Sequence, residues 1–172
     1  MITADHAECL RQQLILESKL GDLSIKDVAY EKRVIPLSRS RHVRGWHPVK
    51  SRHGAIGFES KLECAAISAL ATHYELLSIR SQPITVSYTY EERLRTYTPD
   101  FLVYLSDVPT CLAEMGFGAK TYVEVKPLRM AEVLKERLNL QFAVIRRATG
   151  LPIVLLTEVD IPLISGGPLH AR

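Results

Sequence analysis

Two short apolar segments of this chain carry ionisable residues at positions where a buried β-strand normally carries none. Residues 98–105 (TPDFLVYL) contain Asp100, and residues 121–126 (TYVEVK) contain Glu124 and Lys126. A charged group in a buried strand is costly unless another group neutralises it. Side chains alternate along a strand, so Glu124 and Lys126 share one face of their strand. Asp100 lies on the face of its own strand opposite the one that carries Phe101, Val103 and Leu105. If the two segments pair as a hairpin, Asp100 therefore meets Glu124.

The segments around this pair predict a mixed α/β fold. Helices are expected at residues 4–20, which Gly21 ends, at 59–73, and at 128–149, which Gly150 ends. Strands are expected at 83–90, 98–105, 121–126 and 152–158, with a short strand within 28–36, a hairpin connection from Glu91 to Arg95 and a loop over 106–120. The order helix, three strands, helix, strand predicts one mixed β-sheet with helices on both faces.

Length and residue usage narrow the class of protein. A chain of 172 residues predicts a single domain with one sizeable core. It has no apolar run long enough to cross a bilayer, and its first residues do not form a secretory signal, so we expect a cytoplasmic protein with no membrane partner. The cysteines Cys9, Cys64 and Cys111 show no paired or metal-binding spacing and are expected to be reduced thiols.

Residues 32–53 form a basic segment without a single Asp or Glu. Gly45 and Pro48 interrupt any long helix there, so the segment is expected to be loop-like. One interpretation is a loop that contacts DNA phosphates, and the other is an ordinary solvated surface. The residues that we expect to contact DNA are Arg39, Arg41, Arg44, Lys50 and Arg52. The same segment contains His42, His47 and His53, whose spacing fits no standard zinc site.

The acidic pair and the lysine indicate metal-assisted chemistry. Two carboxylates brought together repel each other, and a hard divalent cation such as Mg²⁺, for which Mn²⁺ can substitute, removes that repulsion. Such an ion polarises a phosphoryl oxygen and lowers the pKa of a bound water. Lys126 would position the water or stabilise charge in the transition state. Glu63, on the helix expected at 59–73, would complete the site directly or through a water, and either one metal or two would be compatible with these residues.

Taken singly, these features are ordinary, because a Pro-Asp pair, a Glu-x-Lys pair and an acidic helix residue are common on protein surfaces. In combination they resemble the PD-(D/E)xK nuclease superfamily of restriction-endonuclease-like folds. More narrowly, the chain resembles the catalytic domain of the TnsA-type endonuclease subunits of heteromeric transposases. The matching stretches, which together span roughly residues 40–160, are 45–48, 58–63, 82–83, 97–103 and 122–127.

The resemblance implies a restriction-endonuclease-like mixed β-sheet flanked by helices, with an αβββαβ core at residues 58–160. Residues 1–57 would pack on that core as an N-terminal helix and basic segment, and 161–172 would form a short tail. It also implies Mg²⁺-dependent cleavage of double-stranded DNA at the 5′ ends of a transposon, beside a DDE-type transposase that cuts the 3′ ends and an ATPase regulator. Members of this family carry a C-terminal domain that docks on the ATPase, whereas here only residues 161–172 follow the last expected strand. A homodimer is left open.

For individual residues, the resemblance implies a metal site, a catalytic lysine and two further side chains. Asp100 and Glu124 would bind the metal together with the Val125 carbonyl. Lys126 would be the catalytic lysine and Glu63 the carboxylate from the helix. Gln82 would be a supporting residue near the site. Two other functions stay open: a repair, restriction or junction-resolving nuclease of the same fold, and a DNA-binding subunit that does not cut.

Overall fold

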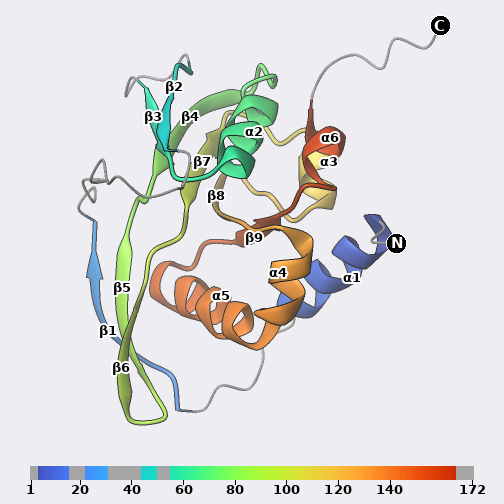
Figure 1. Cartoon of the computed structure of the whole chain (residues 1–172). Helices are drawn as coiled ribbons and strands as arrows, with labels where there is room; N and C mark the ends of the chain where they lie inside the picture. Colours follow the sequence, from blue (N-terminus) through green and yellow to red (C-terminus); the bar gives the residue numbers. More distant parts are fainter. Residues whose placement is uncertain (1–3, 16–21, 31–43, 50–54, 166–172) are drawn as a thin grey trace, which may run out of the picture.

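The computed structural model describes residues 4–15, 22–30, 44–49 and 55–165, which form a mixed α/β protein (Figure 1). The helices are α1 (Ala4–Ile15), α2 (Lys61–Leu70), α3 (Thr110–Glu114), α4 (Leu128–Val133), α5 (Lys135–Thr149) and α6 (Ile161–Ile164). The strands are β1 (Ser24–Ala29), β2 (Gly45–His47), β3 (Ile56–Phe58), β4 (Leu76–Ser81), β5 (Thr85–Tyr90), β6 (Arg93–Tyr97), β7 (Phe101–Leu105), β8 (Lys120–Val125) and β9 (Ile153–Leu156).

The central sheet carries its strands in the order β4-β7-β8-β9. Strand β7 runs antiparallel to both β4 and β8, whereas β8 and β9 are parallel. A parallel pair requires a long crossover connection, and helices α4 and α5 provide it. The sheet is therefore mixed, as the sequence predicts, and β9 is buried along its whole length.

Helices cover both faces of the central sheet, which confirms the predicted layering (Figure 1). On one face, Leu102 packs into a core with Phe142 of α5 and with apolar residues of α1 and α4. On the other face, Phe101 and Val123 pack into a second core with Leu70 of α2 and with residues of α3 and α6. Because side chains alternate along each strand, β7 and β8 contribute to both cores.

The strand expected at 83–90 lies in a different sheet, so its predicted place in the central sheet was wrong. Strand β5 lies between β1 and β6 in an antiparallel sheet that contacts α5. The connection expected from Glu91 to Arg95 is only a two-residue turn, in which Glu91 and Glu92 have φ of 50° and 60°, the sign that a type I′ hairpin requires. The charged sequence concealed β6 because an edge strand tolerates charges that a central strand excludes.

The central sheet begins instead with β4, which the sequence pattern did not predict. Only Ile79 of this strand is buried, and its other side chains are partly or fully exposed, as suits the edge of a sheet. Strands β2 and β3 form a hairpin, so residues 45–47 are not part of a loop. A Cβ atom at Gly45 would lie 2.6 Å from the Phe58 ring, so glycine allows this close approach.

Several predicted boundaries also differ. The helix expected at 59–73 is limited to α2, and the helix expected at 128–149 is divided at Leu134 into α4 and α5. The loop expected over 106–120 contains α3, and a further short helix, α6, follows the last strand. Gly150 ends α5 in the left-handed conformation, as predicted. Residues 16–21 and 31–36, parts of the first expected helix and strand, lie outside the described residues.

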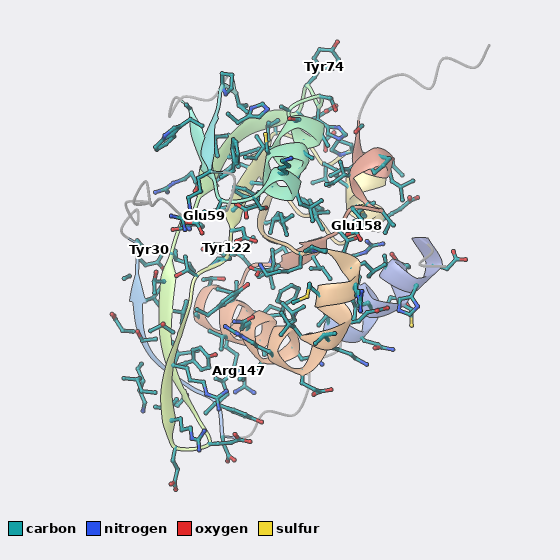
Figure 2. The ribbon with its side chains drawn as sticks, viewed as in Figure 1. Tyr30, Glu59, Tyr74, Tyr122, Arg147 and Glu158 are labelled. Atoms are coloured by element: carbon teal, nitrogen blue, oxygen red, sulfur yellow. The ribbon has the colours of Figure 1, made fainter. Side chains whose placement is uncertain are left out.

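Side chains fill the space between the central sheet and its helices, whereas Tyr74, after α2, projects away from the molecule (Figure 2). Among the described residues, no helix combines the length and apolar character needed to span a membrane.

Candidate active site

The pairing of β7 with β8 brings the predicted acidic residues together. Phe101 lies opposite Val123 in this antiparallel pair, so the next position on each strand places Asp100 beside Glu124. The Asp100 carboxylate also accepts a hydrogen bond from the Val125 backbone N–H at 2.8 Å. Asp100 is thereby held against the end of β8, as the hairpin hypothesis requires.

The ammonium group of Lys126 lies among three oxygen atoms. Its Nζ is 2.6 Å from Glu124 Oε1 and 3.6 Å from Asp100 Oδ2. It also donates a hydrogen bond to the Val125 carbonyl oxygen at 3.2 Å. These are the same three groups from which the sequence predicts a metal site. In this structure their oxygens converge on a monovalent cation, the lysine itself.

Burial sets the electrostatics of this cluster. The Glu124 side chain is 5% exposed and that of Asp100 is 19% exposed, while Lys126 keeps 31%. Burial and then the Glu124 charge raise the pKa of Asp100 from 3.8 to about 8, against the opposing effect of Lys126. Burial lowers the pKa of Lys126, but the charges of Asp100 and Glu124 outweigh burial, and this pKa lies above its ordinary value. The single positive charge of Lys126 therefore has to compensate two carboxyl groups, those of Asp100 and Glu124.

Tyr97 holds the other oxygen of Glu124. Its hydroxyl donates a hydrogen bond to Glu124 Oε2 at 2.7 Å. Burial and the neighbouring Glu124 charge raise the pKa of Tyr97 well above 10, so the phenol remains a donor. The sequence analysis assigned no role to Tyr97. The contact could not be read locally, because Tyr97 ends β6 of one sheet and Glu124 lies in β8 of another.

Glu63 lies in the first turn of α2, where it makes a local capping interaction. Its carboxylate accepts hydrogen bonds from the Glu59 backbone N–H at 2.8 Å and from the Ser60 hydroxyl at 2.9 Å. Ser60 in turn accepts a bond from the Glu63 backbone N–H, which completes a variant of the capping box. Burial raises the pKa of Glu63, and its charge acts on Asp100 and Lys126. Glu63 thus acts on the cluster through its charge, while both of its own carboxylate oxygens accept hydrogen bonds within the α2 cap.

Gln82 is connected to Asp100 through the backbone. Its N–H donates a hydrogen bond to the Asp100 carbonyl at 2.8 Å, and its φ of 44° is unusual for a residue other than glycine. The buried Gln82 Oε1 has no hydrogen-bond partner among the described residues. Strained backbone conformations cluster at functional sites.

The donor set suits a magnesium ion. Within the described residues, no group of three or more His, Cys, Asp and Glu side chains is arranged to hold a metal. Mg²⁺ does not need such a group, because it binds through one or two carboxylates and keeps several waters. Asp100, Glu124 and the Val125 carbonyl supply two carboxylates and one neutral oxygen, already gathered around a cation.

The predicted DNA contacts are described only in part. Arg44 is half-buried just before β2, whereas Arg39, Arg41, Lys50 and Arg52 lie outside the described residues. His42 and His53 also lie outside them. The His47 Nε2 makes a hydrogen bond of 2.8 Å with the Ser68 hydroxyl, which connects the β2–β3 hairpin to α2. Cys9, Cys64 and Cys111 are free thiols.

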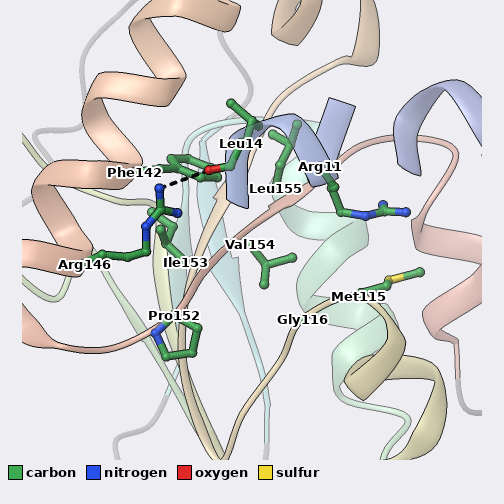
Figure 3. Close-up of a pocket in the computed structure, with 10 residues that line it drawn as sticks. All are labelled: Arg11, Leu14, Met115, Gly116, Phe142, Arg146, Pro152, Ile153, Val154 and Leu155. Atoms are coloured by element: carbon green, nitrogen blue, oxygen red, sulfur yellow. Dashed lines mark hydrogen bonds between the residues drawn. The ribbon is translucent and has the colours of Figure 1, made fainter. Parts of the chain in front are cut away.

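A separate hollow of about 160 Å³ lies beside β9, between α1, α5 and the end of α3 (Figure 3). It is lined mainly by apolar side chains and by Arg11 and Arg146. Arg146 donates a hydrogen bond to the Leu14 carbonyl at 3.0 Å, and Arg11 forms a buried ion pair with Asp160. These contacts attach α1 to the rest of the fold.

Comparison with known proteins adds no assignment. No protein-family model matches this chain, and no curated protein gives a significant match.

Proposed function

We propose that this protein is a Mg²⁺-dependent DNA endonuclease that hydrolyses phosphodiester bonds. The observation that supports this function best is the convergence of Glu124 Oε1, Asp100 Oδ2 and the Val125 carbonyl on the Lys126 ammonium group. A buried and a partly buried carboxyl group beside one lysine form an arrangement that costs stability, and perturbed titrating groups of this kind concentrate at functional sites.

The order of the elements is consistent with this proposal. Helix α2 is followed by β4, β7 and β8 of the central sheet, then by α5 and β9. We infer that these elements form the αβββαβ core of a restriction-endonuclease-like fold, with β4 in the place first given to residues 83–90. Strands β5 and β6 are then an insertion between β4 and β7, and β5 pairs with β1 from the N-terminal part of the chain.

In this proposal Asp100, Glu124 and the Val125 carbonyl hold the ion. When bound, Mg²⁺ supplies positive charge at the scissile phosphate and makes a water easier to deprotonate. Asp100 would hold the ion as a deprotonated carboxylate, because a metal ligand must be deprotonated to bind. Lys126 then donates a hydrogen bond to the attacking water or to a phosphate oxygen and stabilises the charge that develops there. Glu63 contributes negative charge from α2, and Gln82 an acceptor at the edge of the site.

We further propose that the substrate is the 5′ end of a transposon, cut beside a DDE-type transposase and under an ATPase regulator. This step rests on the resemblance carried by the motifs around Asp100 and Lys126. A repair, restriction or junction-resolving nuclease would use the same chemistry. Neighbouring genes separate the two roles, because a DDE transposase gene supports transposition and a methyltransferase gene supports restriction.

The test is cleavage of supercoiled and end-labelled linear duplex DNA with Mg²⁺ or Mn²⁺, with and without the transposase partner. We expect the wild-type protein to cut and Lys126→Met to lose at least about 100-fold in rate, because a charge-stabilising donor is removed. Lys120→Met is the matched control, since Lys120 is an exposed lysine at the start of β8, the strand that Lys126 directly follows, and its Nζ lies 5.2 Å from the Tyr104 ring centre. Salt-dependent duplex binding without any product under these conditions would identify a silent DNA-binding subunit instead.

A further inference from the structure

Tyr97 connects the β1-β5-β6 sheet to the candidate metal site. It is the last residue of β6 and is 6% exposed, and it packs in the same core as Val86, its partner across the strand pair. Its hydroxyl donates a hydrogen bond of 2.7 Å to Glu124 Oε2. The phenol is therefore fixed by packing at the ring and by a carboxylate at its tip.

This hydrogen bond divides the two oxygens of Glu124 between different partners. Oε2 faces the Tyr97 hydroxyl, and Oε1 faces the Lys126 ammonium nitrogen at 2.6 Å. The terminal torsion of a glutamate side chain is broad, so a buried carboxylate needs an outside partner to fix its orientation. With Oε2 held, Oε1 is directed toward the place where Asp100 and the Val125 carbonyl also converge.

We propose that Tyr97 is a positioning residue that orients Glu124 for metal binding, an inference that rests on the proposed function. Tyr97 acts through Glu124 and does not touch the reacting atoms. Carboxylates that bind metals are themselves commonly held by hydrogen bonds, and loss of such a partner costs about 10- to 100-fold in metal affinity. Tyr97 also precedes Asp100 by only three residues, so one short segment crossing between the sheets supplies both a ligand and the group that orients the other ligand.

The test compares wild type, Tyr97→Phe and a matched control by isothermal titration with Mn²⁺ and no DNA. Tyr97→Phe keeps the packed ring and removes only the hydroxyl, so we expect Mn²⁺ affinity to fall about 10- to 100-fold. The control is Tyr88→Phe, which deletes a hydroxyl from a tyrosine that is 3% exposed in the same core, and its affinity should match wild type. Cleavage by Tyr97→Phe should recover at saturating Mn²⁺, because the lysine and both carboxylates remain.

The outcomes separate the two proposals. Wild-type protein that binds no Mn²⁺ would overturn the proposed function itself. Wild type that binds, with Tyr97→Phe within twofold of it, would overturn only the role of Tyr97. A crystal of wild-type protein soaked with Mn²⁺ gives a test that needs no variant. We expect one Glu124 oxygen on the ion and the other within hydrogen-bond distance of the Tyr97 hydroxyl, and a phenol separated from Glu124 would refute the inference.

Discussion

Replacing Asp100 by asparagine should stabilise the metal-free protein, although it removes a predicted metal ligand. Burial and Glu124 raise the pKa of Asp100 from 3.8 to about 8. Between these values the folded protein keeps a proton that the unfolded chain has released, so wild-type stability falls as pH rises through this window. Asparagine is neutral at every pH and can still accept the hydrogen bond from the Val125 N–H.

The size of the effect follows from the shift in pKa. Each unit corresponds to about 1.36 kcal/mol, so Asp100→Asn gains up to about 4 kcal/mol at pH 7 and almost nothing near pH 4. The side chain keeps 19% exposure and loses its attraction to Lys126, so we expect a gain of about 2–4 kcal/mol at pH 7. For a chain of this length each kcal/mol raises the melting temperature by about 2–4 °C.

The assay is urea or thermal unfolding from pH 4 to pH 9 in the presence of a chelator. Asp107→Asn is the matched control, because Asp107 is exposed and accepts a 2.9 Å bond from the Val108 N–H, as Asp100 does from Val125. That substitution should change stability by less than about 0.5 kcal/mol. An Asp100→Asn protein that is less stable than wild type throughout the window would refute the argument that the ionisable Asp100 carboxyl group costs stability in the folded protein.

Metal should narrow or abolish the difference in stability between the two proteins. Mn²⁺ at a hundred times its dissociation constant stabilises wild type by about 2.7 kcal/mol, because it binds only the folded protein. Asp100→Asn lacks one carboxylate and should gain little from the same addition. Equal stabilisation of both proteins would mean that the ion binds elsewhere.

Three further predictions concern single groups. Lys126→Met should bind Mn²⁺ at least as tightly as wild type while losing cleavage, since its ammonium no longer competes for the same oxygens; weaker binding by titration would show that the lysine holds those oxygens in place. Arg11→Met should cost about 3–5 kcal/mol in urea unfolding because it leaves Asp160, which is fully buried, without its ion pair, and adding Asp160→Asn should recover most of the loss. Glu63→Ala should lower the free energy of unfolding by about 1 kcal/mol, because the α2 cap is lost. Glu63→Gln keeps an acceptor for the Glu59 N–H and removes only the charge, so comparing the two variants in the cleavage assay separates capping from charge.

Much of the candidate site could be predicted from local patterns. Alternation along residues 121–126 places Glu124 and Lys126 on one face, and an antiparallel pairing with 98–105 is enough to bring Asp100 to them. The capping role of Glu63 was also present in the sequence, because Ser60 and Glu63 have the spacing of a capping box. The sequence analysis did not use that signal, because it weighed Glu63 only as a metal ligand or a surface residue.

Other features could not be predicted because their sequence patterns are weak or their partners are distant. Strand β4 buries only Ile79 and so lacks the alternation that identifies a half-buried strand. Strand β6 is charged because it lies at an edge. The separation of β5 and β6 from the central sheet depends on pairing with β1, which is more than fifty residues away in the chain.

The sequence by itself determined the repeating geometry within each segment, namely which side chains share a strand face and where α5 ends at Gly150. These properties follow from backbone geometry over a few residues. Only the tertiary structure decided that Tyr97 reaches Glu124 and that the pKa of Asp100 rises to about 8. Desolvation and a hydrogen bond between two sheets depend on what packs around a group, and that is set by the whole fold.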